Sequence, residues 1–233
     1  MNKKLSFVIV YNSSSGIQMP LADFLGIVKK EYLPSKFKFR VIEIKPGIDL
    51  GKELKLASGE TDNFVVCGGD GTIRETVQHL VDYPNAIITV IPMGSFNHFA
   101  KDIGQSLKIE DAVKAIMQKD SKKIDISQVN DFYYTNISSI GIYTQIAKNK
   151  QKLRKKGLNR YIAMIFATIK ALREFKSVDI VARGKDKIIR RKSSIVFVGN
   201  NPYNVEKKDI GGRKSLNKHY LHFFVFKKVN MVR

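Results

Sequence analysis

The chain has 233 residues, of which 43% are hydrophobic and 10% aromatic, and this composition excludes an intrinsically disordered protein. Its single cysteine, Cys67, excludes a disulfide framework. The formal net charge of +20 indicates an anionic partner, and nucleic acid, an acidic lipid surface and polyphosphate all satisfy that charge.

Strand-like and helical patterns alternate over the first half of the chain. Short apolar runs predict strands at residues 5–11, 64–67 and 86–91, and apolar residues that alternate with charges predict a more exposed strand at residues 37–44. Amphipathic spacing predicts helices at residues 21–28, 50–57, 73–81 and 109–117. This β-α-β-α order predicts an α/β fold, with a doubly wound and mostly parallel sheet over residues 1–125.

The pattern changes after Lys122, where strand-like runs follow one another without intervening helices. These runs lie at residues 124–126, 132–135, 178–181, 188–189, 195–198 and 221–226. They predict an antiparallel, β-sandwich-like domain, interrupted by one long basic helix between about residues 149 and 175. We therefore expect two domains, at residues 1–125 and 126–233.

A glycine-rich turn, Gly68-Gly69-Asp70-Gly71-Thr72, joins the strand at residues 64–67 to the helix after it. Thr72 is a favourable helix N-cap, and Glu75 three residues later completes a capping box. Because glycine has no side chain, an anion can approach the backbone N–H groups at the positive end of the helix. The turn predicts an anion site, with an ordinary strand-to-helix turn as the alternative.

Two further polar turns follow predicted strands. Residues 92–102 read Pro-Met-Gly-Ser-Phe-Asn-His-Phe-Ala-Lys-Asp, with Ser95 as the expected N-cap, and Asn12 to Gly16 follow the first strand. Turns after parallel strands meet at one edge of the sheet, where open α/β sheets bind ligands. We expect backbone N–H groups and hydroxyls there to hold phosphates, and no Walker-type Gly-x-x-x-x-Gly-Lys-Ser/Thr sequence occurs.

The motifs and their order resemble the catalytic domain of the diacylglycerol kinase family, which includes bacterial lipid kinases. The resemblance rests on Gly68–Thr72, on the Pro-x-Gly-Ser-x-Asn-x-Phe-Ala pattern at residues 92–100, and on the Asn12–Gly16 turn. Further matches are Lys123-Ile124-Asp125, Asn136–Gly141 and Val198–Tyr203. Spread over most of the chain, these matches are specific for the family.

The resemblance implies that ATP binds at the three turns and that a lipid hydroxyl attacks its terminal phosphate, with Mg²⁺ bridging the phosphates. Residues 1–125 would then be a nucleotide-binding lobe and residues 126–233 a lipid-substrate domain. Asn97 is expected mainly to brace its own turn. The predicted nucleotide-binding residues are Asn12, Ser13, Ser14, Ser15, Gly16, Gly68, Gly69, Asp70, Gly71, Thr72, Gly94, Ser95 and Asn97.

Asp70 and His98 are the predicted catalytic residues. Asp70 is expected to orient the phosphates, the metal or the nucleophile, and the alternative is a carboxylate that stabilises a helix N-terminus. His98 stands where the family pattern has aspartate and is expected to accept a proton. Asp102, four residues later on the same helical face, could orient it. The alternative for His98 is a polar cleft or surface histidine.

Two parts of the family pattern are missing from this sequence. The family has an Asp-Asp-Gly-like metal turn where this chain reads Asn217-Lys218-His219, so the metal ligands stay unknown. Its catalytic glutamate lies in a later Asp-Gly-Glu turn, which residues 1–233 do not contain. The leading hypothesis is therefore an ATP-dependent lipid kinase, and the alternative is a kinase-like protein that binds nucleotide or anionic membrane without turnover.

The net positive charge lies almost entirely in the second half of the chain. Residues 1–125 contain 17 basic and 15 acidic residues, whereas residues 126–233 contain 24 and 6. A basic segment at residues 148–156 precedes an apolar run at 161–172, which predicts docking on an anionic membrane surface. The alternative is a solvated helix whose apolar stripe packs on the sheet.

The expected partners follow from this distribution of charge and from the resemblance. We expect a lipid substrate at a membrane surface and contact with anionic lipids, and a homodimer stays open. No nucleic acid partner is expected, because the aromatic residues of the second half fall in strand patterns. The apolar run at 161–172 is shorter than the ~20 residues that span a bilayer. A cytoplasmic protein that is peripheral to the membrane is therefore predicted.

Overall fold

The computed structural model describes residues 6–32, 36–116, 118, 120–174, 177–184, 188–204, 212–213 and 215–227. The chain forms two compact units, residues 1–136 with 200–219 and residues 137–199 with 220–233. The first unit therefore extends past residue 125 and receives a returning segment. The assignment of a nucleotide-binding lobe and a lipid-substrate domain stays a prediction.

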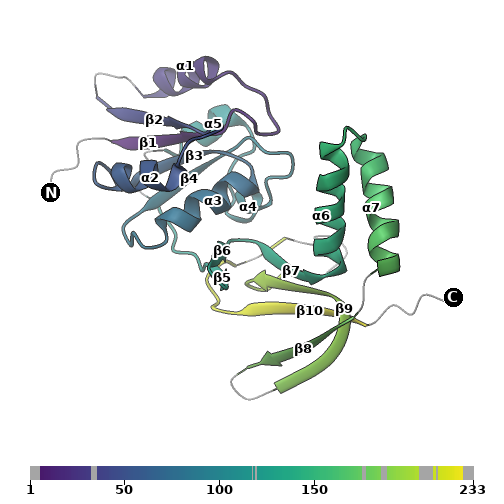
Figure 1. The fold of residues 1–233 in the computed structure, drawn as a ribbon. Helices are drawn as coiled ribbons and strands as arrows, with labels where there is room; N and C mark the ends of the chain where they lie inside the picture. The colour runs from purple at the N-terminus through teal and green to yellow at the C-terminus, as the bar shows by residue number, and fades with distance from the viewer. Residues whose placement is uncertain are drawn as a thin grey trace. The chain divides into compact units, whose positions relative to one another are not determined.

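A parallel sheet of four strands forms the centre of the first unit (Figure 1). Its order is β2-β1-β3-β4, and β1 pairs in parallel with both β2 and β3. The strands are β1 (Phe7–Tyr11), β2 (Phe39–Glu43), β3 (Asn63–Gly68) and β4 (Ile87–Pro92). The predicted α/β class and parallel sheet are confirmed.

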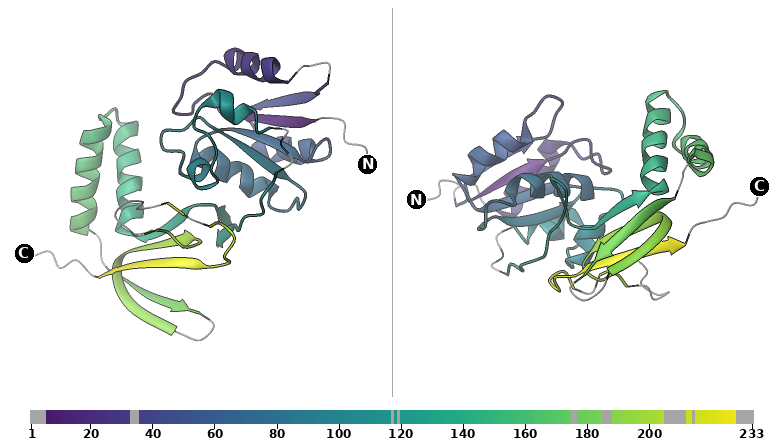
Figure 2. Two further views of the ribbon diagram at one scale, coloured as in Figure 1. Left: turned by 180° about the vertical axis from the view of Figure 1, so that it is seen from behind. Right: turned by 60° about the horizontal axis from the view of Figure 1, so that its bottom comes forward.

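Five helices lie on the two faces of this sheet, so the unit has three layers (Figure 2). They are α1 (Leu21–Glu31), α2 (Leu50–Ser58), α3 (Asp70–Leu80), α4 (His98–Asp102) and α5 (Ile109–Val113). Alternate residues of β1 enter different cores: Ile9 packs with α1 and α5, whereas Val8 packs with α2. Both faces of the central strands β1 and β3 are buried, which explains why these two strands read as nearly continuous apolar runs.

A short hairpin of β5 (Ser127–Val129) and β6 (Phe132–Tyr134) completes the strands of the first unit. The side chain of Gln78 on α3 ties the hairpin down, because it accepts a hydrogen bond from the Tyr133 N–H and donates one to the Asp131 carbonyl. A strand expected at residues 124–126 is absent from the described structure, where pairing begins at Ser127.

The second unit consists of an antiparallel sheet and a pair of helices. Its sheet has the order β10-β9-β7, with β8 also paired to β9. Strands β7 (Ile137–Gly141) and β8 (Val178–Arg183) both run antiparallel to the long β9 (Ile188–Asn200), and β10 is Leu221–Lys227. The predicted change from a parallel to an antiparallel architecture is confirmed.

The single basic helix expected near residues 149–175 is instead two helices, α6 (Ile142–Lys155) and α7 (Arg160–Glu174), which pack side by side (Figures 1 and 2). Gly157 separates them with a φ of 86°. Such a left-handed conformation suits glycine, because it has no Cβ, and it ends α6. None of the helices in the described part of the chain is long and apolar enough to cross a membrane.

Candidate functional site

Three turns meet at the carboxyl-terminal edge of the parallel sheet, after β1, β3 and β4. Their contact is close, because a Cβ added to Gly94 would lie 2.4 Å from the Cα of Gly69. A Cβ on Gly16 would lie 2.7 Å from the Ser95 hydroxyl oxygen. Glycine at these positions lets three backbones approach one another, and the predicted meeting of the turns is confirmed.

The helices after these turns begin differently from the prediction. Helix α3 starts at Asp70 with Gly69 as its N-cap, so Thr72 is inside the first turn and no capping box forms. The Thr72 hydroxyl instead accepts a hydrogen bond of 2.8 Å from the Asn12 side-chain amide, which connects two of the turns. Ser95 is likewise not a cap, because α4 starts at His98 after Asn97.

Asn97 braces the turn after β4, as predicted. Its side-chain oxygen accepts from the Gly94 N–H at 2.8 Å, and its side-chain nitrogen donates to the Gly94 carbonyl at 2.9 Å. Asn97 has a φ of 52° and is buried. Asparagine tolerates this left-handed conformation better than most residues because its short side chain can bond locally.

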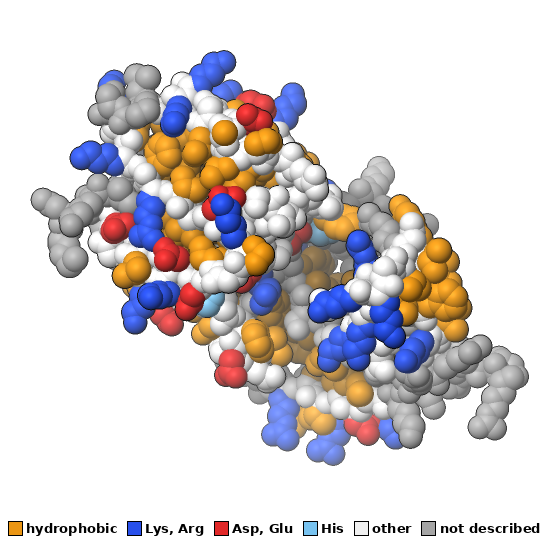
Figure 3. All heavy atoms as spheres, turned by 45° about the horizontal axis from the view of Figure 1, so that its top comes forward, with side chains coloured by type: hydrophobic (Ala, Val, Ile, Leu, Met, Phe, Trp, Pro, Cys, Tyr) orange, Lys and Arg blue, Asp and Glu red, His pale blue; other side chains and the backbone are white. Residues whose placement is uncertain are grey.

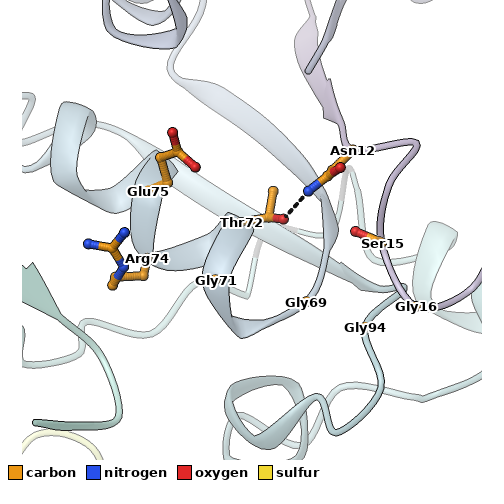
Figure 4. A pocket seen from close by; sticks show the side chains of 9 residues that line it. All are labelled: Asn12, Ser15, Gly16, Gly69, Gly71, Thr72, Arg74, Glu75 and Gly94. Atoms are coloured by element: carbon orange, nitrogen blue, oxygen red, sulfur yellow. Dashed lines mark hydrogen bonds between the residues drawn. The ribbon is translucent and has the colours of Figure 1, made fainter. Parts of the chain in front are cut away.

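A cavity of about 360 Å³ opens where the turns meet (Figure 4). Seven predicted nucleotide-binding residues line it: Asn12, Ser15, Gly16, Gly69, Gly71, Thr72 and Gly94. Six others do not: Ser13, Ser14, Gly68, Asp70, Ser95 and Asn97. Ser13 and Ser14 are exposed on the first turn, where the Ser14 N–H donates to the Asn12 side-chain oxygen.

The sequence interpretation missed two residues that line the cavity, Arg74 and Glu75. Both project from the start of α3, whereas Ser15 and Gly16 lie on the turn after β1 (Figure 4). Helical spacing could have identified them, because residues three and four positions after Gly71 share its face. Arg74 brings a positive charge to the cavity, and Glu75 brings the one carboxylate among the lining residues.

The Asp70 carboxylate binds the start of α4. It accepts hydrogen bonds from the backbone N–H of Phe99 at 2.8 Å and of His98 at 3.2 Å. The side-chain amide of Asn136 donates to it at 3.1 Å. Asp70 therefore supplies to a neighbouring helix the acceptors that an N-cap side chain normally provides, and a negative charge at that end is favourable.

Asp102, at the other end of α4, forms a buried ion pair with Arg213. Their side chains are 7% and 0% exposed, and the guanidinium nitrogens Nη2 and Nε lie 2.7 and 2.8 Å from one carboxylate oxygen. Arg213 also donates to the carbonyls of Thr135 and Asn200 and to the side-chain oxygen of Asn136. This network, which we call the Arg213 network, connects through Asn136 to Asp70.

The expected pairing of His98 with Asp102 is not formed, because the Asp102 carboxylate is bound by Arg213. His98 is exposed, and its ring stacks on Phe96 with 5.6 Å between the centroids. Stacking and exposure agree with the alternative of a surface histidine, and its catalytic role stays a prediction.

The Asp125 carboxylate binds the turn Asn217-Lys218-His219, which has no carboxylate of its own. The Asp125 side chain accepts from the His219 N–H at 2.7 Å and lies 2.8 Å from His219 Nδ1. Sequence analysis recognised Asp125 only as part of a motif, because the two partners are 94 positions apart in the chain. Among the described residues, no group of three or more His, Cys, Asp or Glu side chains could hold a metal ion.

Burial raises the pKa of Tyr134 and of three further groups in this unit. It raises the pKa of Tyr203 to about 12, and the ring centroid lies 5.2 Å from the Arg213 guanidinium carbon. It also raises the pKa of Tyr11, whose hydroxyl donates to the Met19 carbonyl at 2.5 Å. The buried Cys67 thiol has a pKa well above its ordinary value of 9.0. All four remain protonated at neutral pH.

Residues 6–129 match the family model of the diacylglycerol kinase catalytic domain. That match covers more than half of the 233 residues. The chain belongs to this family. The sequence resemblance is thereby confirmed, and the turns around the cavity lie within the matched region.

Proteins of the same family are similar over much of the chain. A Staphylococcus carnosus protein, provisionally named a lipid kinase, is 29% identical over 177 residues, or 73% of this chain and 56% of that protein. A diacylglycerol kinase of Staphylococcus epidermidis is 25% identical over 235 residues, which cover 96% of this chain and 71% of that protein. The chain thus spans about half the length of the first curated relatives, at 56% and 49% of theirs.

A crystal structure from Bacillus anthracis, provisionally described as a diacylglycerol kinase, has the same fold. It aligns with a TM-score of 0.72 and 21% identity, covering 97% of this chain and 77% of that chain. The parallel sheet, the antiparallel sheet and their order along the chain are therefore those of the diacylglycerol kinase family.

Proposed function

We propose that this protein is a lipid kinase that transfers the γ-phosphate of ATP to the hydroxyl of diacylglycerol or a related lipid. The observation that carries the proposal is the cavity at the meeting of three glycine turns, in a chain that belongs to the diacylglycerol kinase catalytic domain family. Phosphoryl transfer depends mainly on positioning and charge neutralisation, which a rigid set of turns can supply.

The ATP phosphates would be held by the turns and by Arg74. The first turn of α3 offers backbone N–H groups beside Gly69 and Gly71, which line the cavity without side chains. Ser15 and Asn12 add hydrogen-bonding side chains. Arg74 lines the cavity and would supply the cation that a Walker lysine supplies in other nucleotide-binding proteins, and an arginine can bind phosphate with two parallel hydrogen bonds.

Mg²⁺ would be held jointly by the protein and the nucleotide. The lining side chains Glu75, Asn12, Ser15 and Thr72 offer oxygen atoms, which this ion prefers, but only one carboxylate. This set fits an ion that keeps several waters and bridges phosphates. When bound there, Mg²⁺ would neutralise charge on the phosphates, and Glu75 is its proposed protein ligand.

Asp70 and His98 have different proposed roles. Asp70 would fix the start of α4, because its carboxylate is bound by two N–H groups of that helix and by Asn136. His98 would accept the proton of the lipid hydroxyl, since its imidazole is exposed. The His98→Gln variant, which cannot accept that proton, should then bind ATP normally and lose transfer.

A second candidate function is nucleotide binding without turnover. It is favoured by one observation, that Asp102 binds Arg213, so that no carboxylate within the described part of the chain pairs with His98. A histidine without an orienting partner is a weaker proton acceptor, because its ring orientation and tautomer are not fixed.

The test is transfer of labelled γ-phosphate to diacylglycerol, ceramide, sphingosine or phosphatidylglycerol in mixed micelles, together with calorimetric titration by ATP and Mg²⁺. Labelled lipid supports the kinase, whereas ATP binding without transfer supports the second candidate. Arg74→Gln should weaken ATP binding by roughly ten-fold or more. Lys55→Gln is the matched control, because this exposed residue on α2 does not line the cavity. Unchanged ATP affinity in Arg74→Gln would show that the cavity is not the nucleotide site.

The proposed cellular setting follows from the same function. A lipid substrate requires access to a membrane, and the excess of basic over acidic residues after residue 125 suits an anionic leaflet. We propose a cytoplasmic protein that associates peripherally with such membranes. A homodimer stays an untested prediction.

A further inference from the structure

Helix α7 presents its large apolar side chains outward and its small ones inward. Ala163, Ala167 and Ala171 are fully buried, and their spacing of four residues puts them on one side of the helix. α7 packs beside α6 (Figures 1 and 2), so this alanine side faces that helix. The expected alternative, an apolar stripe packed on the sheet, is therefore not what the structure shows.

The opposite side of α7 is a continuous apolar surface, which we call the α7 face. At 100° per residue its members cover an arc of about 140°. Surface helices normally expose polar residues along such an arc, and contiguous exposed apolar surface marks an interaction site. All of its members are exposed: Tyr161, Ile162, Ile165, Phe166 and Ile169.

The part of the chain that contains the α7 face carries positive charge and almost no negative charge. No Asp or Glu occurs between Asp131 and Glu174, while nine Lys and Arg residues do. Those of α6 whose side chains are exposed are Lys148, Lys152, Arg154 and Lys155. In Figure 3 hydrophobic side chains gather along the outer edge of the helix pair, beside a group of Lys and Arg side chains.

This combination identifies the occupant as an anionic bilayer surface. An apolar helix face flanked by basic residues is the arrangement of helices that lie in a membrane interface. A second copy of the chain would bring the same positive charge to the contact, and like charges repel. We propose that the α7 face inserts among the lipid chains while the basic residues of α6 contact anionic headgroups. The inference deepens the proposed lipid kinase function, because it names the surface that would bring the enzyme to its substrate.

Tryptophan fluorescence tests insertion directly, since the chain has no tryptophan. Phe166→Trp places a single reporter on the α7 face, and Leu56→Trp places one on α2 as the matched control. The two positions are 57% and 55% exposed. Each variant is mixed with vesicles of phosphatidylcholine alone or of phosphatidylcholine with phosphatidylglycerol.

The expected result is a blue shift of the Phe166→Trp emission and its quenching by acyl-chain-brominated lipid, only with the phosphatidylglycerol vesicles. Leu56→Trp should show neither effect. Vesicle binding that leaves the emission of the Phe166→Trp variant unshifted would overturn insertion in favour of adsorption by charge alone. Absence of binding to the anionic vesicles would overturn the whole proposal, and so would a blue shift that appears without vesicles and grows with protein concentration.

Sedimentation with the same vesicles measures the two contributions separately. Ile165→Gln with Phe166→Gln should lower the partition coefficient by about ten-fold or more, whereas Leu56→Gln should not change it. Lys152→Gln with Lys155→Gln should lower it by roughly 25-fold, since each basic residue near an anionic surface contributes about five-fold. Unchanged partition in both double variants would refute the assignment.

ATP titration of the Ile165→Gln, Phe166→Gln variant separates this inference from the proposed function. The variant should keep its ATP affinity, because it changes no residue that lines the cavity. If the unaltered protein binds vesicles through the α7 face but does not bind ATP, the proposed function fails and the membrane surface stands. If it binds ATP but not vesicles, the membrane surface fails and the proposed nucleotide site stands.

Discussion

Replacing Arg213 by methionine should destabilise the first unit more than any exposed substitution. The Arg213 guanidinium is fully buried and forms an ion pair with a carboxylate that is only 7% exposed. Methionine has a comparable apolar stem but leaves that carboxylate buried without its partner, a change that costs about 3–5 kcal/mol. Three acceptors, in Thr135, Asn200 and Asn136, lose their donor as well.

Urea unfolding followed by circular dichroism measures this cost. For a slope of about 2 kcal/mol per molar, the midpoint of Arg213→Met should fall by about 2 M. The urea midpoint of Arg213→Lys should lie between those of the unaltered protein and of Arg213→Met, because lysine keeps the charge but cannot reproduce the planar set of donors.

The double variant Arg213→Met, Asp102→Leu separates the ion pair from the other contacts. It removes both charges, so its cost should be smaller than the sum of the single costs by about 2 kcal/mol. Additive costs within about 0.5 kcal/mol, or a cost of Arg213→Met below about 1 kcal/mol, would refute the view that this ion pair organises the site.

Three other properties can be measured on the same protein. Gly94→Ala should lower stability by about 1–3 kcal/mol in urea unfolding, because its Cβ would lie 2.4 Å from the Gly69 backbone, whereas Gly71→Ala meets nothing within 4 Å and should be neutral or stabilising. Equal costs for the two would contradict the close-approach argument. The free energy of unfolding should fall as pH rises from about 9 towards 12, because burial holds the protons of Cys67 and of Tyr203, whose pKa is about 12, while the unfolded chain releases them from pH 9.0 and 10.0. If Tyr203→Phe does not reduce this dependence of the unfolding free energy on pH, the dependence arises from other groups. Cys67 should react with Ellman's reagent only after unfolding, since its thiol is buried and protonated, and fast labelling of the native protein would refute that burial.

Much of the first unit could be predicted because its signals are local. Residues 64–67 form a strand that is apolar throughout, and both of its faces are buried by helices. The positions of the turns after β3 and β4 predict that the turns meet at one edge of the sheet, and the structure shows the Gly69–Gly94 contact there. The order of these motifs was also sufficient to indicate the family, and the match over residues 6–129 confirms it.

The errors arose where a side chain had two plausible partners. Thr72 has a favourable capping pattern, but its hydroxyl accepts from Asn12, which is 60 residues away. Asp102 has the spacing to reach His98, but its carboxylate binds Arg213 instead, because a buried guanidinium and a buried carboxylate satisfy each other's charge. Local spacing cannot rank such partners, since the competitor comes from a distant part of the chain.

The sequence by itself determined the α/β class, the family, the three turns and the imbalance of charge, because these depend on periodicity, glycine placement and composition. Only the tertiary structure decided that Arg74 and Glu75 line the cavity, that Asp70 serves α4, and that α7 packs through alanines with its large apolar side chains outward. The physical reason is the same in each case. A periodic pattern shows which residues share a side of a helix, but which side is covered depends on elements that the chain brings together from afar.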